Sequence, residues 1–399
     1  MLSGMGAKIA DAGSVAFVAS LHPDRDDLEQ VTEALGALWT RGVPVDLRSR
    51  YPSGARLALP TMAWAGESYW LDAPTASPGS AGDPLADATW AVDWRLGKAP
   101  RRPATGPWLV IGDDAVAEGL AARGAMVLSE FTDGVGHVVF APSAEDLTAQ
   151  SIAWTAAQWA NRGAKIHLVA RTAARPETAA LSGLGRVIAA EHPERWGGYV
   201  DVHGGTVDDL IDALLADDGE DLVRVTDAGR AVGRLIRASV PAAASIPLDG
   251  GAVLITGGFG GVGAHLARQL ADLGAKHLVL VGRTGAASAE ATARVEELEA
   301  RGVEVDAKKA NVANRRSLKA VVDKIPDLIG VIHAAGTADD GRLEDLEEQQ
   351  FDDVLGPKVD GAKLLHELTA GRDLRFFVLG SSAAGVLGVR GQANYAAAT

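Results

Sequence analysis

The sequence has no cysteine among its 399 residues. Disulfide bonds, thiolate metal sites and a cysteine nucleophile are therefore excluded, and we expect no bound metal. Long apolar runs are also missing, because no window reaches the roughly 18 consecutive apolar residues of a membrane-spanning helix. No charged segment followed by an apolar one opens the chain, as a secretory signal would. We therefore expect a soluble, cytoplasmic protein without a membrane partner.

Positive charge is scarce as well. The 38 Lys and Arg residues are outnumbered by 52 Asp and Glu residues, which gives a net charge of −14. A nucleic-acid partner is not expected, because phosphate binding requires a basic face. A Gly-x-Ser-x-Gly elbow is also missing, so acyl transfer by a serine of that kind is not expected.

The sequence does contain enough apolar material, 47% of its residues, for sizeable cores. A chain of this length predicts two or three domains. Residues 1–72 resemble a small α/β unit, with a helix at 24–41 and a short strand at 43–47. Residues 73–88 are rich in Pro, Gly, Ser and Ala, which is typical of a linker.

Residues 89–246 predict a second unit with an α/β rhythm. The turn after its first strand carries Asp113 and Asp114 and has no glycine cluster, so it would repel a pyrophosphate. We interpret this unit as a structural, degenerate copy of the unit that follows. Its buried strands are expected at 108–112, 137–140 and 166–170.

Residues 247–399 predict a third unit in which strands and helices alternate. Such alternation predicts a parallel, doubly wound sheet. The first helix has Val262, Leu266, Leu270 and Leu273 along one stripe, which we expect to face the sheet. The predicted fold class is α/β, with two Rossmann-like subdomains behind a small α/β unit. The strands of the third unit are expected at 252–256, 277–281, 304–312, 328–333 and 375–379.

A run of glycines lies between the first strand and the first helix of the third unit. Glycines there permit a tight turn and let backbone N–H groups approach a pyrophosphate at the positive end of the helix. Glycines also close helix–strand packing where nothing is bound, but the strand before and the helix after this run favour a dinucleotide site. The predicted contacts are Thr256, Gly257, Gly258, Phe259, Gly260, Gly261, Val262 and Gly263.

The end of the second strand indicates which dinucleotide is bound. An NAD site usually has an acid there for the ribose 2′-hydroxyl, whereas this chain has Arg283, whose guanidinium fits a 2′-phosphate. We therefore predict NADPH; the alternative is a solvated surface arginine. Ordinary strand-end packing is the alternative for Asn311 and for the small residues after the fourth strand. The further predicted contacts are Thr284, Asn311, Val312, Ala334, Ala335 and Gly336.

Ser382 and Tyr395, thirteen residues apart, are the candidate catalytic pair. Reduction of a carbonyl requires a hydride donor, a proton donor and a group that polarises the oxygen. A tyrosine has an ordinary pKa of about 10 and needs a nearby cation to act near neutral pH. Ser382 can bond the substrate oxygen. A turn serine and a buried tyrosine are the alternatives, but after a dinucleotide motif the pair predicts hydride transfer to a ketone.

Several motifs resemble the ketoreductase domain of modular type I polyketide synthases, a branch of the short-chain dehydrogenase/reductase superfamily. Upstream segments resemble the structural subdomain of that family and the linker that follows an acyltransferase domain. The ketoreductase motifs are VIHAAGTADDG (331–341), PKVDGA (357–362), SSAAGVLG (381–388) and GQANY (391–395). The upstream motifs are LSGLGRV (181–187), EHPERWGG (191–198), VPVD (43–46), LPT (59–61) and YW (69–70).

The resemblance implies that Lys358 is a catalytic lysine that also contacts the cofactor. The family has Asn four residues after the tyrosine, where this chain has Thr399. A threonine is shorter than an asparagine and cannot bridge as an amide does. From the residues alone, Lys358 would be interpreted as a solvated helix lysine.

Stereochemistry is also implied by resemblance. B-type members of the family carry Leu-Asp-Asp near the fourth strand, and here Asp339 and Asp340 keep both acids after Ala338. A-type members carry a Trp where this chain has Leu387. These positions predict a B-type reductase that gives a D-configured β-hydroxyl. The alternative is that the two acids only cap the following turn.

The implied reaction is the NADPH-dependent reduction of a β-ketoacyl thioester, held on the phosphopantetheine arm of an acyl carrier protein. Because the chain contains no carrier domain, the carrier is expected as a neighbour, together with ketosynthase and acyltransferase domains. Two alternatives stay open: a free-standing short-chain alcohol dehydrogenase, and a catalytically impaired remnant of a synthase. The large subdomain before the glycine run disfavours the free-standing enzyme, because single-domain reductases lack it.

Short-chain reductases continue beyond the tyrosine helix with two more strands and a substrate lid, whereas this sequence stops at Thr399. The apolar strand at 376–379 is then expected at a sheet edge. We therefore expect a fragment or a truncated product that alone reduces β-ketoacyl thioesters poorly or not at all. Comparable turnover by this chain and by a C-terminally extended one would overturn that expectation.

Overall fold

The structure is a computed structural model that describes residues 18–46, 88–98, 101–143, 147–239 and 246–399. The chain divides into two compact units, Met1–Ala81 and Gly82–Thr399. Within the described residues no helix has the length and apolar character needed to cross a membrane.

The first unit contains helix α2 (Asp27–Trp39), as the sequence predicts. The helix begins after Asp26, whose carboxylate accepts hydrogen bonds from the amides of Leu28 and Glu29. The strand predicted at 43–47 is wrong over residues 43–46, which have no regular secondary structure. Pro44 lacks the N–H that a ladder needs, and an isolated strand gains no stability without a partner. The motifs at 59–61 and 69–70 lie outside the described residues.

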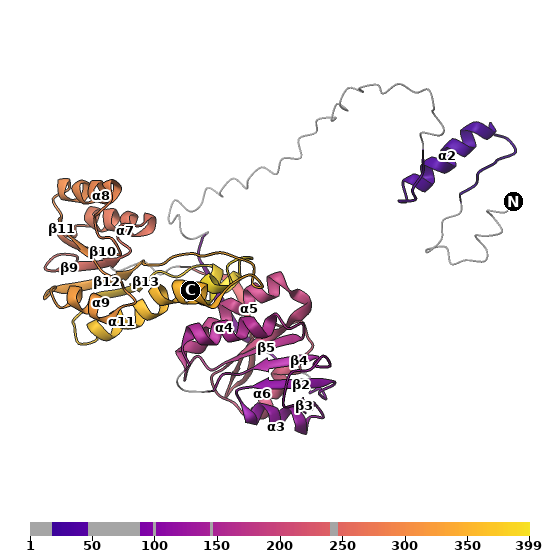
Figure 1. The fold of residues 1–399 in the computed structure, drawn as a ribbon, viewed down its shortest axis with the longest axis horizontal. Coiled ribbons are helices and arrows are strands. Elements are labelled where there is room, and N and C mark those ends of the chain that lie inside the picture. The colour runs from indigo at the N-terminus through magenta and orange to yellow at the C-terminus, as the bar shows by residue number, and fades with distance from the viewer. Residues whose placement is uncertain (1–17, 47–87, 99–100, 144–146, 240–245) are drawn as a thin grey trace. The chain divides into compact units, whose positions relative to one another are not determined.

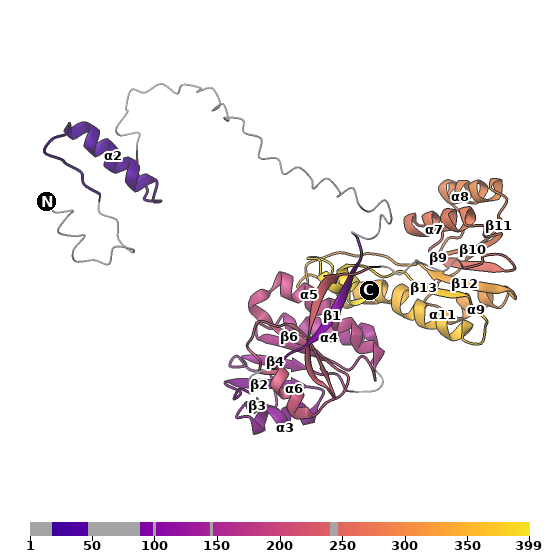
Figure 2. The ribbon, with the colours of Figure 1, turned by 180° about the vertical axis from the view of Figure 1, so that it is seen from behind.

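Two sheets form the second unit among the described residues, and each sheet with its helices is called a subdomain below (Figures 1 and 2). The first sheet has the strand order β1-β8-β7-β6-β5-β4-β2-β3. Its strands are β1 (Trp90–Leu96), β2 (Pro107–Ile111), β3 (Met126–Leu128), β4 (His137–Phe140), β5 (Lys165–Ala170), β6 (Trp196–Val202), β7 (Leu222–Thr226) and β8 (Gly229–Arg237). The second sheet has the order β11-β10-β9-β12-β13 and is parallel throughout. Its strands are β9 (Ala252–Thr256), β10 (His277–Gly282), β11 (Glu304–Lys309), β12 (Leu328–His333) and β13 (Phe376–Leu379).

The predicted α/β fold with two Rossmann-like sheets is therefore confirmed. β9 and β12 are buried along their whole length, because helices cover both faces of a doubly wound sheet. One feature was not predicted: β8 pairs antiparallel with both β1 and β7, so the first sheet is mixed at that edge. β13 lies at the edge of the second sheet.

Helices cover both faces of each sheet (Figures 1 and 2). In the first subdomain α4 and α5 cover one face and α3 and α6 the other; in the second, α7 and α8 lie opposite α9 and α11. These helices are α3 (Asp114–Ala122), α4 (Ala149–Ala160), α5 (Ala180–Glu191), α6 (Val207–Leu214), α7 (Gly261–Asp272), α8 (Ala289–Ala300), α9 (Arg315–Val322) and α11 (Gly361–Thr369). The others in this unit are α10 (Glu348–Leu355), α12 (Ala384–Leu387) and α13 (Ala393–Ala397).

Helix α7 packs differently from the predicted stripe. Val262 and Leu273 are 68% and 72% exposed, so the prediction that they face the sheet is wrong. The buried positions of α7 are Gly263, Ala264, Ala267 and Leu270. The small side chains of Gly263, Ala264 and Ala267 let the backbone of α7 lie close to the sheet. The helix therefore buries the face that carries these small residues.

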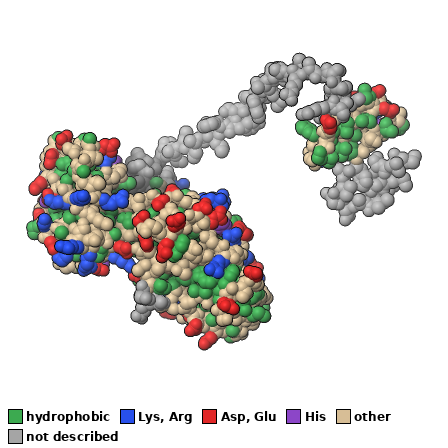
Figure 3. Space-filling model, in the orientation of Figure 1, with side chains coloured by type: hydrophobic (Ala, Val, Ile, Leu, Met, Phe, Trp, Pro, Cys, Tyr) green, Lys and Arg blue, Asp and Glu red, His purple; other side chains and the backbone are tan. Residues whose placement is uncertain are grey.

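One core joins the two subdomains. Leu181 and Leu184 of α5 pack in the same buried cluster as Phe351 of α10 and Ala393 and Ala396 of α13. The first subdomain therefore supports the last helix of the second directly. On the face drawn in Figure 3, the second unit carries Lys and Arg side chains interspersed with Asp and Glu side chains.

Two histidines, His167 buried and His137 partly buried, lie together at the amino end of the first sheet. Nδ1 of His137 lies 3.1 Å from Nε2 of His167, and the His137 ring stacks on Trp108 with centroids 4.1 Å apart. Burial lowers the pKa of His137 and lowers the pKa of His167 to about 3. Both rings are therefore neutral at pH 7, and one can donate a hydrogen bond to the other.

This pair predicts a pH-dependent stability. The unfolded chain protonates His167 near its ordinary pKa of about 6.5, and the folded chain does so only near 3. Between these values the unfolded state binds more protons, so the free energy of unfolding falls as pH falls, by about 1.4 kcal/mol per pH unit. We expect His167→Asn to weaken this pH dependence. Below pH 6, the slope of its free energy of unfolding against pH should be smaller by about 1.4 kcal/mol per pH unit. Urea unfolding of both proteins between pH 7 and pH 5 measures the difference, and equal slopes would contradict it.

Candidate functional site

A cleft of about 470 Å³ lies at the carboxyl ends of the strands of the second sheet. Open α/β sheets bind ligands at this edge. The structure brings together in this cleft most of the residues predicted to contact a dinucleotide. The predicted residues that line it are Gly257, Phe259, Gly260, Arg283, Thr284, Asn311, Val312, Ala334, Ala335 and Gly336.

The glycine turn at one end of the cleft has no room for side chains. Gly257 has a φ of +69°, and a β-carbon there would lie 2.6 Å from the carbonyl oxygen of Ala334. A β-carbon on Gly263 would lie 2.2 Å from the carbonyl oxygen of Gly257. Gly260 caps α7 without a side-chain hydrogen bond, so no side chain occupies the first amides of the helix. A tight turn with uncapped amides fits a pyrophosphate.

In the corresponding turn of the first sheet, a side chain occupies the first amides of the helix. Oδ1 of Asp113 accepts hydrogen bonds from the amides of Ala115 and Val116 at the start of α3. The other oxygen of Asp113 forms an ion pair with Arg171. The carboxylate therefore occupies the place where a phosphate would bind. This geometry supports the interpretation that the first subdomain is structural.

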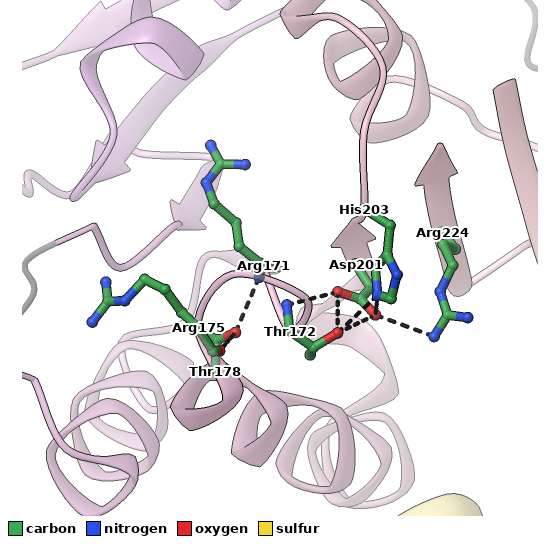
Figure 4. Close-up of polar contacts among 7 residues, drawn as sticks. All are labelled: Arg171, Thr172, Arg175, Thr178, Asp201, His203 and Arg224. Carbon is green, nitrogen blue, oxygen red and sulfur yellow. Dashed lines mark hydrogen bonds and ion pairs between the residues drawn. The ribbon is translucent and has the colours of Figure 1, made fainter. Parts of the chain in front are cut away.

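A second polar cluster lies at the carboxyl edge of the first sheet (Figure 4). Asp201 is buried and accepts hydrogen bonds from the amide and hydroxyl of Thr172 and from Arg224. His203 Nε2 lies 2.8 Å from the Thr172 hydroxyl and 2.7 Å from Asp201 Oδ2. A catalytic triad needs the acid and the nucleophile on opposite ring nitrogens, whereas both approach the same one here. The hydrogen bonds of this cluster therefore join β6, β7 and the loop after β5. The cluster was not predicted from the sequence.

Two of the polar side chains that line the cleft were predicted to contact the adenosine half of a dinucleotide. Arg283 follows β10, lines the cleft and forms no ion pair with any described residue. Its guanidinium is therefore available to a 2′-phosphate. Asn311 lines the cleft as well, and its side-chain oxygen accepts a hydrogen bond from the amide of Ala313. This bond fixes the orientation of the Asn311 side chain.

Lys358 approaches Tyr395 near the cleft. Its Nζ lies 5.0 Å from the centroid of the Tyr395 ring and donates a hydrogen bond of 3.3 Å to the carbonyl oxygen of Gly380. Burial lowers the pKa of Lys358. The lysine stands in a π-helical turn, η3 (Gly356–Asp360), between α10 and α11. Pro357 has no N–H for the regular helical pattern, which accounts for the wide turn.

Ser382 lies in the loop after the edge strand rather than in the strand. β13 ends at Leu379, three residues before Ser382. Its hydroxyl accepts a hydrogen bond from the amide of Ala384 and caps the first turn of α12. The neighbouring Ser381 donates instead to the carbonyl oxygen of Thr399, at 2.5 Å.

The hydroxyl of Thr399 donates to the backbone oxygen of Tyr395 at 3.0 Å. Thr399 therefore supports the backbone of α13. Lys358 lies over the Tyr395 ring without Thr399 between them.

Thr256 does not line the cleft, which corrects its predicted role as a cofactor contact. It is fully buried, and its hydroxyl lies 2.6 Å from Nδ1 of His333, its register partner on β12. Four other residues of the predicted run also lie outside the lining of the cleft and shape the turn or the start of α7 instead. They are Gly258, Gly261, Val262 and Gly263.

His333 lies against the lysine turn and Asn394 directly precedes Tyr395, and neither was predicted as a site residue. His333 is 2% exposed, and its Nε2 lies 3.2 Å from the carbonyl oxygen of Lys358, so it couples the end of β9 to the lysine turn. Burial lowers the pKa of His333, which keeps the ring neutral at pH 7. Asn394 is fully buried and donates to the backbone oxygens of Asp339 and Gln350. A polar residue ending an apolar strand was the available signal for His333.

The residues predicted for stereochemical control do not gather at one place. Asp339 accepts a hydrogen bond from Gln350, and Asp340 accepts one from Gln392, so both acids fasten the loop that they occupy. Leu387 is 59% exposed and lines a separate groove beside Val92 of β1, not the dinucleotide cleft. The described residues include no group of three or more His, Asp or Glu able to hold a metal ion.

A family model described as "KR domain" matches residues 251–399. Among curated proteins, a pikromycin polyketide synthase component of Streptomyces venezuelae is 33% identical over 96% of this chain and 27% of its own length. An erythronolide synthase of Saccharopolyspora erythraea is 32% identical over 97% of this chain and 13% of its own length. The chain thus spans about a quarter or less of these relatives.

Solved structures indicate the same family, and this chain covers a larger share of their length than of the curated relatives. An A-type ketoreductase from a modular polyketide synthase has a TM-score of 0.69 and 32% identity, over 79% of this chain and 78% of that one. The first ketoreductase of the tylosin synthase has a TM-score of 0.66 and 34% identity over the same shares of the two chains. The chain therefore belongs to the ketoreductases of modular polyketide synthases.

Proposed function

We propose that this chain reduces a β-ketoacyl thioester to the β-hydroxyacyl thioester, with NADPH as the reductant and an acyl carrier protein as the carrier of the substrate. One observation carries the proposal: the Lys358 ammonium lies over the Tyr395 ring beside the glycine-lined cleft. Lys358 reaches this place because Gly336 lines the cleft without a side chain. A β-carbon on Gly336 would lie 3.0 Å from Cε of Lys358.

The side chains near the cleft supply what the reduction of a ketone needs. When bound there, a reduced nicotinamide supplies the hydride that the carbonyl carbon accepts. The Tyr395 phenol donates its proton to the carbonyl oxygen, which becomes the hydroxyl of the product. The Lys358 ammonium, whose Nζ lies 5.0 Å from the centroid of the Tyr395 ring, stabilises the negative charge that remains on the tyrosine oxygen. The Ser382 hydroxyl donates a hydrogen bond to the same oxygen and polarises the ketone.

The test follows NADPH consumption with a β-ketoacyl thioester, using this chain alone and within a polypeptide that continues beyond Thr399. We expect consumption by the longer polypeptide and formation of the β-hydroxyacyl thioester. Oxidation of simple secondary alcohols without reduction of thioesters would favour a free-standing alcohol dehydrogenase. NADPH binding without turnover in both polypeptides would favour a catalytically impaired remnant and would overturn the proposal.

The preference for NADPH over NADH rests on Arg283. We expect Arg283→Ala to weaken NADPH binding about 10- to 100-fold, because a charge-assisted hydrogen bond contributes about 1.5–3 kcal/mol. NADH binding is expected to change little, since NADH lacks the 2′-phosphate. Fluorescence titration with the two cofactors measures both constants in one preparation. Equal losses for NADPH and NADH would show that Arg283 does not read the 2′-phosphate.

We also propose B-type stereochemistry, with a D-configured β-hydroxyl. Asp339 and Asp340 support it, because their hydrogen bonds fix the loop beside the segment that carries Tyr395. Chiral analysis of the hydroxyacyl product tests this choice, and an L-configured product would overturn it. The proposed partners are the acyl carrier protein and neighbouring ketosynthase and acyltransferase domains, since the curated relatives are long polyketide synthase chains.

A further inference from the structure

The segment that carries Tyr395 rests on helix α5 of the first subdomain. Gly183 of α5 faces this segment so closely that a β-carbon there would lie 1.9 Å from the carbonyl oxygen of Ala396. One helical turn further along, Arg186 packs against Gly388, where a β-carbon would lie 2.7 Å from the Arg186 backbone. The helix α5 therefore contacts both α13 and the turn before it (Figures 1 and 2).

The C-terminal end of α5 holds two loops of the other subdomain. Glu191, the last residue of α5, accepts a 2.7 Å hydrogen bond from the amide of Gly391 through Oε1. Its Oε2 accepts a 2.9 Å hydrogen bond from the amide of Leu343. Beside it, the carbonyl oxygen of Ala190 accepts a hydrogen bond from Nε of Arg390. One carboxylate thus joins residues 152 and 200 positions away in the sequence.

The two loops held by Glu191 are those that flank the candidate site. The first runs from Thr337 to Leu343 and contains both acids proposed for stereochemical control. The second runs from Gly388 to Gln392 and leads into α13, which carries Tyr395. Gly341 donates a hydrogen bond to the carbonyl oxygen of Gly391 at 2.8 Å, and this bond also joins the loops.

Side chains extend the connection between the loops toward Tyr395. Nε2 of Gln392 donates to Asp340, and Nδ2 of Asn394 donates to the backbone oxygen of Asp339. The amide of Tyr395 in turn donates to Oδ1 of Asn394 at 2.8 Å. A chain of hydrogen bonds therefore runs from the first subdomain, through both loops, to the backbone of the proposed proton donor.

We propose that Glu191 is a positioning residue for the reduction. Its carboxylate fixes the positions of the two loops relative to each other. The loops in turn fix the position of the Tyr395 phenol relative to a bound substrate. Glu191 touches neither substrate nor cofactor in this role. The inference rests on the proposed function for its catalytic consequence, whereas its effect on the loops is independent of any activity.

Glu191→Ala tests the proposal, because it leaves the amides of Leu343 and Gly391 without their acceptor. We expect kcat to fall at least about 10-fold, since small misplacements of reacting groups have large effects on rate. The affinity for NADPH is expected to stay within about 2-fold, because Thr337 is the only residue of the two loops that lines the dinucleotide cleft, and neither hydrogen bond of Glu191 goes to it. The share of the minor hydroxyl stereoisomer is expected to rise. Hydrogen exchange at residues 341–343 and 388–391 is expected to become faster.

Two further variants separate positioning from general stability. Glu191→Gln keeps one carbonyl oxygen in place, so its rate and its exchange are expected to lie between those of the wild type and Glu191→Ala. Glu194→Ala is the matched control: Glu194 carries the same charge, lies three residues away, has a side chain 63% exposed, and its described ion pairs are with its sequence neighbours His192 and Arg195. It is expected to keep the wild-type rate, because exposed ion pairs contribute little.

The outcomes distinguish a failure of the Glu191 proposal from a failure of the proposed function. Wild-type kcat, stereoisomer ratio and exchange in Glu191→Ala would overturn it, and a lower melting temperature with unchanged kcat would reduce Glu191 to a structural role. If the alanine variant does not fold, the same readings on Glu191→Gln decide. If the wild type reduces no β-ketoacyl thioester, the proposed function fails. Faster exchange in the variant then still supports loop fixation by Glu191, and unchanged exchange overturns it.

Discussion

Tyr395→Phe is expected to lower the kcat for reduction of a β-ketoacyl thioester by about 10²- to 10⁴-fold, the usual contribution of a positioned acid. The substitution removes the only proton that this side chain can donate and keeps the ring. The ring is partly buried against the core shared by the two subdomains, and it faces Nζ of Lys358. Packing of α13 and binding of NADPH are therefore expected to persist. Rates at saturating NADPH, with a separate cofactor titration, measure the two quantities.

A matched control exists for the loss of a phenolic hydroxyl. Tyr199 of β6 is 3% exposed in the first subdomain, far in sequence from the glycine turn, and burial raises its pKa. Tyr199→Phe is expected to alter stability without lowering kcat. All rates are compared within one polypeptide background, so the ratio does not depend on flanking residues. A Tyr395→Phe variant that turns over within about 3-fold of the wild type would remove Tyr395 from the mechanism.

Gly263→Ala is expected to weaken NADPH binding about 100-fold. The added β-carbon would meet backbone atoms of Gly257 and Gly258 at 2.2–2.9 Å, and backbone cannot move aside as a flexible side chain can. The turn must therefore shift away from α7, which misaligns the amides that would face the pyrophosphate. Losing two charge-assisted hydrogen bonds of about 1.5 kcal/mol each corresponds to about 100-fold in the dissociation constant. Calorimetric titration with NADPH measures this loss.

The control for this glycine is Gly371, which lies in the same subdomain between α11 and β13. A β-carbon there meets no atom within 4 Å, so Gly371→Ala is expected to bind NADPH as the wild type does. Thermal melting of both variants separates loss of the site from loss of the fold. Wild-type affinity in a folded Gly263→Ala variant would show that the glycine turn does not hold the pyrophosphate.

The sequence predicted the second sheet well, because its central strands are continuous apolar runs. β9 and β12 begin and end where their patterns do, since both faces of these strands are buried. Most of the residues predicted to contact a cofactor line the cleft for a related reason: the carboxyl ends of neighbouring parallel strands meet at one edge. Lys358 could be predicted only by resemblance, because nothing local marks a lysine in a π-helical turn as different from a surface lysine.

The remaining features depend on contacts between distant residues. Glu191 ends a helix and looks like any surface acid in sequence, yet its partners lie 152 and 200 residues away. Thr256 was predicted as a cofactor contact because it precedes the glycines. It is instead buried in the core, where it pairs with His333 of the neighbouring strand. Leu387 was assigned a role in stereochemical control by resemblance to the family. The folding of α12 against the first subdomain places it in another groove.

The central claim is that this chain, with NADPH held on its glycine turn, delivers a hydride to the β-carbon of a ketoacyl thioester. The most direct measurement uses NADPH that carries deuterium at the transferable position, with mass spectrometry of the acyl product. The account predicts a single deuterium at the β-carbon of the hydroxyacyl thioester, and formation of this labelled product about 10²- to 10⁴-fold more slowly by Tyr395→Phe. Unlabelled hydroxyacyl product from the wild type, or no product in any polypeptide that contains this sequence intact, would contradict it.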